Sequence, residues 1–141
     1  MSATISSINY CPVKSISFQT IDNCQIKKRI GISGDRVFAF AKNLDIDQIK
    51  LFEKSSEARK GKWNKILTLK NTPVLNKYNF LLNKNELTLN SKDNTILTIN
   101  TNESNQCIEL SNKILELENS VKGPITLMKN FENPFFDTTI S

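Results

Sequence analysis

The chain has 141 residues, the length of one ordinary domain with a single hydrophobic core. Its formal net charge is +5 at pH 7, which suits an anionic partner such as nucleic acid, phosphate or an acidic protein surface, although scattered lysines that keep the surface solvated explain the charge more simply. The three cysteines form no CxxC pair and histidine is absent, which argues against a disulfide framework and against a zinc site.

The first third of the chain predicts short β-strands separated by turns. β-prone or alternating segments occur at residues 5–10, 16–18, 24–30 and 37–41. Pro12 indicates a strand end or an edge position, because proline has no backbone N–H to donate. Gly31 and Gly34 bracket a tight loop, and the apolar run that follows them predicts a strand buried on both faces.

Residues 45–59 have a different pattern. Ile46, Ile49 and Phe52 recur at helical spacing, and Gly61 lies just beyond them as a stop signal. Asp45 or Asp47 can cap a helix. We therefore expect a short helix or a mobile excursion here, inserted between strands.

The middle of the chain predicts a β-meander. A strand at 66–69 and a turn at 72–73, with one helical turn after it, lead into strands at 79–82, 86–89 and 95–99. Leu87 and Leu89 on one strand, and Leu97 and Ile99 on the next, are each spaced by two residues. Side chains spaced by two point to the same side of a sheet, so we expect these leucines and isoleucine to share one face.

The last forty residues or so begin with a helical pattern. Thr101 or Ser104 can cap a helix that runs to about Asn119, and Gly123-Pro124 ends it before a short strand at 125–128. Its apolar stripe is an expected packing face and consists of Cys107, Leu110, Ile114, Leu117 and Val121.

These elements together predict a mainly β fold: a small β-barrel with an inserted short helix, followed by a C-terminal helix and strand. The barrel is expected over residues 1–100, and the helix and strand over residues 101–141. The apolar segment 131–140 is expected to be exposed unless something covers it. Such a patch would favour self-association or pairing with another chain.

Two segments place cations at strand boundaries. Residues 10–15 read Tyr-Cys-Pro-Val-Lys-Ser, and residues 31–36 read Gly-Ile-Ser-Gly-Asp-Arg. Lys14 offers an ammonium, Ser15 a hydroxyl, and Arg36 a planar guanidinium suited to two phosphate oxygens. If the fold brings them together they form an oxyanion site. From spacing alone, a purely structural role explains the same residues. Pro12 would shape a strand end, the glycines would form a turn, and Arg36 would make a local ion pair with Asp35.

These two segments, with the apolar strand after them, resemble the N-terminal β-barrel domain of MOSC proteins, where MOSC denotes the C-terminal domain of molybdenum-cofactor sulfurases. The likeness is strong over residues 3–41 and looser over residues 66–99. The mitochondrial amidoxime-reducing component has the same pairing of barrel and MOSC domain. Residues 101–141 are similar to the start of the MOSC domain itself, which would be incomplete here.

The resemblance implies that molybdopterin lies between the two halves and that the barrel contacts its phosphate. The family's Lys-Ser pair falls on Lys14 and Ser15, and its Asp-Arg arginine falls on Arg36, so we expect these three residues to bind the cofactor. Asp35 is expected to orient a neighbouring cation, and Tyr10 and Pro12 to be scaffold.

The chain also departs from the family. Cys11 stands between Tyr10 and Pro12, and we interpret it as a buried strand cysteine. The family's molybdenum-ligating cysteine lies in the MOSC domain, and none of Cys11, Cys24 or Cys107 has an equivalent place. We therefore assign no catalytic residue and no metal ligand to this chain. Residues 45–62 look like an insertion relative to the shortest relatives.

The leading hypothesis is a cofactor-binding half of a MOSC-family molybdenum-cofactor protein. Its partners would be the missing MOSC domain or a neighbouring MOSC chain, with an electron-transfer partner for the complete protein. Whether it belongs to an enzyme stays open: complete relatives are molybdenum-dependent oxidoreductases or handle cofactor sulfur, and the isolated chain is expected to be inactive.

The alternative is a non-catalytic basic β-barrel that binds nucleic acid or a protein partner. Trp63 lies near Lys62 and Lys65 and can either stack on a nucleobase or serve as a core or rim residue. The phenylalanines occur mostly in apolar strand contexts, which favours core positions over nucleic-acid contacts. No signal peptide or membrane span is evident, so a reducing cytoplasm is the expected compartment.

Overall fold

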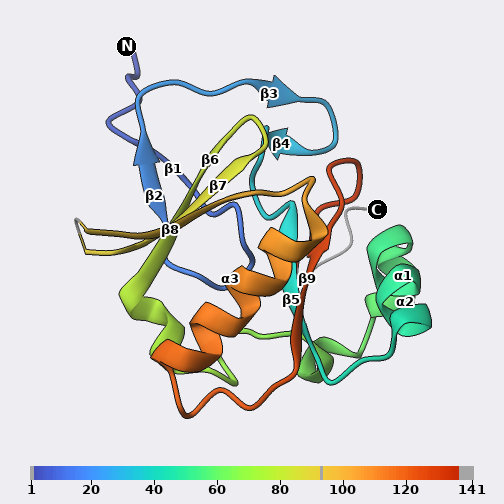
Figure 1. Cartoon of the computed structure of the whole chain (residues 1–141). Coiled ribbons are helices and arrows are strands. Elements are labelled where there is room, and N and C mark those ends of the chain that lie inside the picture. The colour runs from blue at the N-terminus through green and yellow to red at the C-terminus, as the bar shows by residue number, and fades with distance from the viewer. Residues whose placement is uncertain (1, 93, 137–141) are drawn as a thin grey trace.

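A computed structural model describes residues 2–92 and 94–136 of the chain (Figure 1). It is a mixed α/β structure with 31% strand and 26% helix. The strands form several small antiparallel sheets, with the orders β1-β2, β3-β4, β5-β9 and β6-β7-β8, and none closes into a barrel. The expected mainly β fold is therefore met in part, and the closed barrel is not formed.

The centre of the molecule is β5 (Phe38–Lys42), which pairs antiparallel with β9 (Ile125–Lys129). Its other edge has two short neighbours. Val13 bridges Phe38 in parallel at one end, and Ile66 bridges Ala41 antiparallel at the other. A chain that meets β5 through single bridges makes no continuous ladder there. This explains why the predicted strand at 66–69 is absent. The predicted strand at 16–18 is reduced to a single parallel bridge between Ser17 and Asn79.

The N-terminal strands are shorter than predicted. β1 (Ile8–Tyr10) pairs with β2 (Gln19–Ile21), and β3 (Ile26–Lys27) pairs with β4 (Gly31–Ile32). Pro12 and the left-handed backbone of Ser15, with φ of 64°, prevent β1 from extending along β5. The expected barrel fails at this interruption.

The predicted meander is confirmed as β6 (Tyr78–Asn83), β7 (Glu86–Ser91) and β8 (Asn94–Asn100). Leu87 pairs with Ile99 and Leu89 with Leu97, as expected for one shared face. The helix α3 (Ser104–Leu117) packs against β8 and β9. Glu103, rather than Thr101 or Ser104, is its N-cap residue. A 3₁₀ helix, η2 (Pro73–Lys77), precedes β6.

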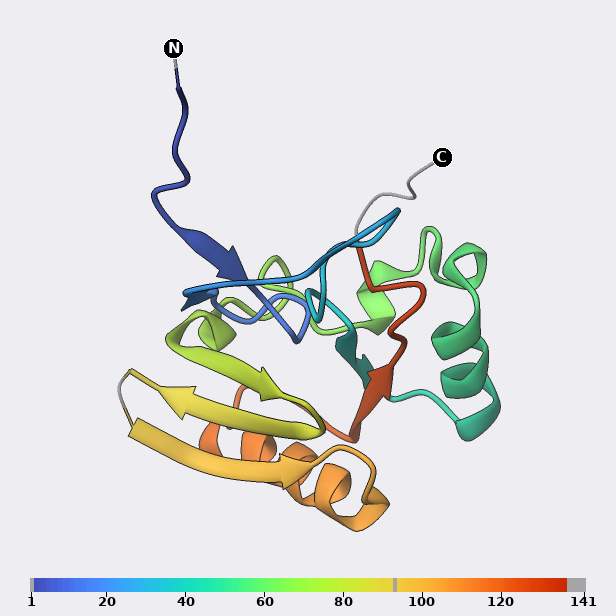
Figure 2. The same cartoon turned by 90° about the horizontal axis from the view of Figure 1, so that it is seen from above.

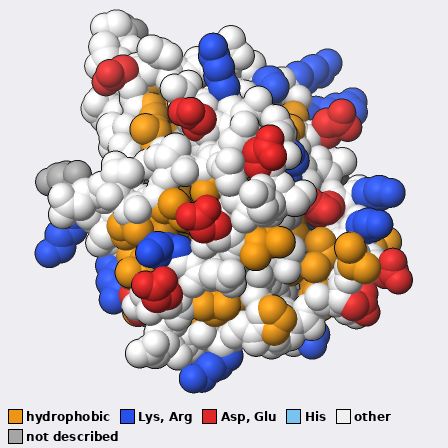
Figure 3. Space-filling model, viewed as in Figure 1, with side chains coloured by type: hydrophobic (Ala, Val, Ile, Leu, Met, Phe, Trp, Pro, Cys, Tyr) orange, Lys and Arg blue, Asp and Glu red, His pale blue; other side chains and the backbone are white. Residues whose placement is uncertain are grey.

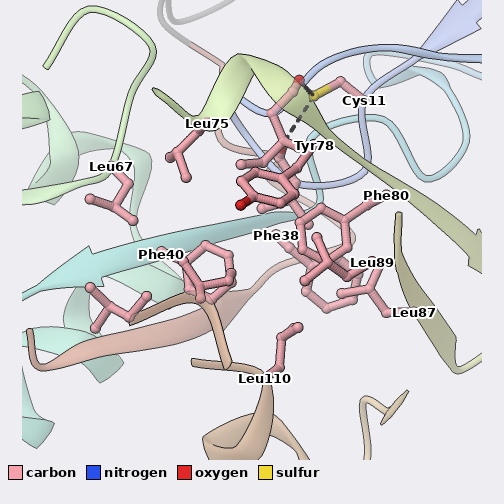
Figure 4. Packing of buried hydrophobic residues seen from close by; sticks show 14 of the residues in the cluster. Cys11, Phe38, Phe40, Leu67, Leu75, Tyr78, Phe80, Leu87, Leu89 and Leu110 are labelled. Atoms are coloured by element: carbon pink, nitrogen blue, oxygen red, sulfur yellow. Dashed lines mark hydrogen bonds between the residues drawn. The ribbon is translucent and has the colours of Figure 1, made fainter. Parts of the chain in front are cut away.

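The core lies between the three-stranded sheet, β5 and α3. Figure 4 shows side chains from β5, β6, β7 and α3 converging there. The buried residues include Val13, Phe38, Phe40, Phe80, Leu87, Leu89, Leu110 and Ile114. The predicted units 1–100 and 101–141 thus both contribute to one cluster. Burying these side chains supplies most of the driving force for folding.

The predicted helix at 45–59 is confirmed as α1 (Ile46–Lys54) and α2 (Ser56–Arg59). Asp45 caps α1 by accepting the backbone N–H of Gln48 at 2.8 Å. Both helices lie on the far side of β5 and β9 from the three-stranded sheet (Figure 2). Phe52 of α1 packs in a second cluster with Phe135.

Part of the C-terminal apolar segment, which the sequence predicts to be exposed unless something covers it, is covered within the chain. Phe135 is 0% exposed and lies 3.9 Å, ring centroid to Cζ, from the guanidinium of Arg59. Pro134 is also buried, while Phe131 is 41% exposed. Residues 137–141, where the expected patch continues, lie outside the described residues. Among the described residues, no helix is both long and apolar enough to cross a membrane.

Candidate anion-binding site

Lys14, Ser15 and Arg36 line one open cleft with a volume of about 550 Å³. The sequence places Arg36 on a different loop from the other two, so the fold brings the three predicted residues together. The described residues that line the cleft are Cys11, Lys14, Ser15, Ile16, Ser17, Phe18, Arg36, Trp63, Thr68, Leu69, Lys70 and Asn76. The charged side chains in this set are all cationic, which suits an anionic ligand.

Main-chain hydrogen bonds hold the two loops in register. The N–H of Arg36 donates to the carbonyl of Cys11 at 2.6 Å, and the N–H of Phe38 donates to the carbonyl of Pro12 at 3.0 Å. The N–H of Lys14 donates in turn to Phe38 at 2.8 Å. The backbone of Lys14 is therefore fixed beside Phe38, where β5 begins, and Arg36 lies two residues before that point.

Both loops use left-handed backbone conformations at site residues. Ser15 has φ of 64° and Arg36 has φ of 52°. Such angles are uncommon outside glycine and cost local backbone energy. The bonds of the neighbouring backbone to β5 hold these conformations in place, and they turn the chain sharply where each residue meets the cleft.

Asp35 links the two loops and forms the local ion pair with Arg36 that both interpretations of the sequence predict. Its Oδ1 accepts the N–H of Cys11 at 2.8 Å, and its Oδ2 lies 3.2 Å from Nη1 of Arg36. The same carboxylate thus ties one loop to the other and limits how the guanidinium can turn. The Arg36 side chain keeps 33% of its surface exposed, so it remains reachable from solvent.

Lys14 is almost entirely buried, with 3% of its surface exposed. Its Nζ lies 4.4 Å from the ring centroid of Trp63, which begins the 3₁₀ helix η1 (Trp63–Lys65). A cation over an indole face is attracted by the negative charge density of the ring. The ammonium therefore faces a prepared wall of the cleft.

Cys11 is a buried thiol among the residues that line the cleft, and it follows the end of β1 at Tyr10. Its interpretation as a buried strand cysteine is therefore correct for its burial but wrong for the strand. Its Sγ is 2.8 Å from the carbonyl oxygens of Val13 and Ile16 (Figure 4). Burial raises the pKa of Cys11 to about 11. A protonated thiol directed at two carbonyls is a poor metal ligand, because the thiolate is the form that binds metals.

The opposite wall is a loop organised by Asn71. Its Oδ1 accepts the N–H of Thr68 at 3.0 Å, and its Nδ2 donates to the carbonyl of Ile66 at 2.9 Å. These bonds fix the turn that carries Leu69 and Lys70. The wall is thus shaped before any ligand binds.

Sequence reasoning missed most of this wall. It noted Trp63 as a possible stacking residue but did not connect it with Lys14. The sequence did not indicate a binding role for Thr68, Lys70 or Asn76. Nothing near them in the sequence shows that this part of the chain lies against the N-terminal segment. Only the pairing of β5 with Ile66 would have revealed it, and that pairing is a single bridge.

Among the described residues, no group of three or more histidine, cysteine, aspartate or glutamate side chains could hold a metal ion. On the face shown in Figure 3, lysines and arginines are spread among acidic and neutral side chains rather than gathered in one field.

Comparison of the chain with protein-family models, with curated proteins and with solved structures found no match.

Proposed function

We propose that this chain is the cofactor-binding half of a MOSC-family molybdenum-cofactor protein and that its cleft receives the phosphate end of molybdopterin. The observation that carries the proposal is the convergence of Lys14, Ser15 and Arg36 on one cleft. These are the residues onto which the family's phosphate-binding positions fall.

The donor groups of the cleft fit a phosphate. An ammonium carries three N–H donors, a guanidinium offers a planar fork, and a hydroxyl can donate to a third oxygen. Lys14, Arg36 and Ser15 provide one of each. Trp63 and Phe18 add flat apolar surface in the same cleft for the organic part of the ligand.

The residues of this chain do not fit the metal end of the cofactor. The cysteine at the cleft, Cys11, is buried as a thiol with a raised pKa of about 11. The molybdenum ligand and the redox chemistry that the metal supplies when bound would therefore come with a partner MOSC half. The part left to this chain is to bind and orient the phosphate.

The proposal also covers the family's β-barrel, which this chain does not close. Ser17 bridges Asn79 of β6, and Val13 bridges Phe38 of β5, so the segment between them joins the three-stranded sheet to the β5-β9 pair edge to edge. We infer that this succession corresponds to an opened form of the family's barrel. Cys11, Cys24 and Cys107 are free thiols, which is consistent with the reducing cytoplasm proposed as the compartment.

Co-expression with a MOSC-half polypeptide tests the function. We expect a purified complex that retains molybdopterin, detected as pterin fluorescence after oxidation. Changing Lys14 and Arg36 together to Ala should reduce that retention at least tenfold, because each lost charge-assisted hydrogen bond is worth about 1.5–3 kcal/mol. The matched control is the double change of the exposed Lys28 and Arg29 to Ala. A complex without pterin, or equal retention by the double variant, would refute the proposal.

A second candidate is a binding module for single-stranded nucleic acid. One observation favours it: Phe18 lines the cleft and is 60% exposed, beside Trp63 and Lys70. Exposed aromatic side chains beside cations are typical of such platforms. Filter binding of an oligonucleotide at low and moderate salt separates the candidates, because binding to nucleic acid weakens steeply as salt rises.

A further inference from the structure

Lys14 and Trp63 meet because both follow the same edge of β5. The N–H of Lys14 donates to Phe38 at 2.8 Å, and the N–H of Leu67 donates to Phe40 at 2.9 Å. Phe38 and Phe40 are two residues apart on one strand, so their carbonyls hold the two loops side by side. The turn of η1 before Leu67 then brings the indole over the ammonium.

The surroundings of Lys14 restrict the conformations that its side chain can adopt. A lysine side chain has four rotatable bonds, and its ammonium is normally solvated in water. Here the side chain is 3% exposed, and the Trp63 ring centroid lies 4.4 Å from Nζ. The ring thus occupies one side of the ammonium, and both residues line the same cleft.

We propose that Trp63 is a positioning residue of the anion site, which acts on a bound anion through the ammonium of Lys14. The inference rests on the proposed function in that the cleft must bind an anion. The indole compensates in part for the water that the buried ammonium has lost, and it directs the charge toward the ligand. Without the ring, the ammonium loses one of the contacts that hold it, so more of its ordering is left to the step in which the anion binds.

The chain provides its own reporter for this role. Trp63 is its single tryptophan, so the intrinsic tryptophan fluorescence of the protein comes from one wall of the cleft. An anion that draws the ammonium away from the ring, or closer to it, should change this emission. We therefore expect added pyrophosphate to change the fluorescence of the full chain in a saturable way.

The test is a double-mutant cycle on the full chain, with pyrophosphate binding measured by calorimetry. Trp63→Leu should weaken binding by about 3- to 30-fold, the range expected for losing a partly desolvated cation–π contact. Trp63→Phe, which keeps an aromatic face, should recover part of that loss. In a Lys14→Met background, Trp63→Leu should have little further effect, because the ring then has no ammonium to hold.

Lys70→Met supplies the matched control, since Lys70 lines the same cleft from the other loop. In the Lys70→Met background, Trp63→Leu should weaken pyrophosphate binding by the same factor as in the unmodified chain. Equal, additive losses in both backgrounds would overturn the positioning role while leaving the anion site intact. If the unmodified chain binds no pyrophosphate, the positioning role fails, whereas the proposed function is refuted by a co-expressed complex that retains no pterin. Should Trp63→Leu not fold, the cycle is run with Trp63→Phe, and no difference between the lysine backgrounds overturns the inference.

Discussion

The backbone N–H of Arg36 donates a hydrogen bond to the carbonyl of Cys11 over 2.6 Å. This bond joins the two sequence segments that carry the candidate site. Asp35 adds a second link, because its carboxylate accepts the N–H of Cys11 while it pairs with the Arg36 guanidinium. The carboxylate therefore has two separable roles, one structural and one electrostatic.

Asp35→Asn separates these roles. The amide oxygen can still accept the N–H of Cys11, so we expect a stability loss within about 1 kcal/mol. The negative charge beside Arg36 is gone, and we expect pyrophosphate to bind severalfold more tightly as a result. Thermal denaturation and calorimetry measure the two effects. Asp35→Ala should lose about 1–3 kcal/mol, because it leaves the buried N–H without its acceptor. Weaker anion binding by Asp35→Asn would contradict the electrostatic role.

Arg59 is the second residue with a strong expected effect, this time on stability. Its side chain is 1% exposed and donates to the carbonyls of Phe52, Glu53, Asn133 and Pro134. Burial lowers the pKa of Arg59 to about 10, an effect that the charge of Glu53 offsets in part. The arginine nevertheless remains charged at neutral pH and ties α1 to the C-terminal segment.

We expect Arg59→Met to lower the free energy of unfolding by about 2–4 kcal/mol, since several carbonyls lose their donor. Arg59→Lys should recover little of this, because an ammonium cannot reproduce the planar fork. Urea denaturation measures both variants. Arg29→Lys is the control, as Arg29 is exposed on the β3-β4 hairpin, and it should change the stability by less than about 0.5 kcal/mol. Full rescue by lysine would contradict the fork interpretation.

The cap residue and the register of the meander show how far local pattern determines this fold. The spacing of Ile46, Ile49 and Phe52 predicts α1, and Asp45 caps it. The period of two in Leu87 and Leu89 predicts the buried face of β7. In these elements the chemistry that decides the structure lies within a few residues of sequence.

The missing barrel and the covered C-terminal segment show where local pattern fails. Whether β5 acquires a continuous neighbour on the edge opposite β9 depends on Pro12 and on the positive φ of Ser15, and the latter is set by contacts from other segments. Phe135 is buried against Arg59, and because charged residues are rarely buried, nothing in the local sequence indicates this contact. The candidate site falls between these cases. Its two motifs are visible in short stretches of sequence, whereas the wall that contains Trp63 comes from a distant segment that the sequence does not connect with them.

Glu118 makes the stability of the fold sensitive to acid. Burial alone would raise its pKa, but hydrogen bonds from Lys77 and from the Tyr78 hydroxyl outweigh burial, and the pKa lies below its ordinary value of 4.5. The distances to Oε1 are 2.6 Å from Lys77 Nζ and 2.5 Å from Tyr78 Oη. Because the folded state favours the carboxylate, this contribution to stability is present above about pH 4.5 and is lost as pH falls through the lowered pKa.

We therefore expect Glu118→Gln to lower the free energy of unfolding by about 2 kcal/mol at pH 7 and by less at pH 3, where the parent has lost much of the same contribution. Urea denaturation from pH 3 to pH 7 gives the comparison. Glu109→Gln, an exposed change on α3, whose C-cap residue is Glu118, should leave the profile of the parent unchanged. Parallel profiles for Glu118→Gln and the parent would contradict the assigned cause.

Cys11 should be chemically silent in the folded protein although it lies beside the cleft. It is buried, its Sγ contacts two carbonyls, and its pKa is raised to about 11, so little thiolate exists at pH 8. Cys24 is half-buried and should react first with iodoacetamide, as mass spectrometry of the digested protein would show. In urea both residues should label at similar rates, because unfolding removes the difference between them. Fast labelling of Cys11 without denaturant would show that the cleft opens at Cys11, and the rigid site described above would then be wrong.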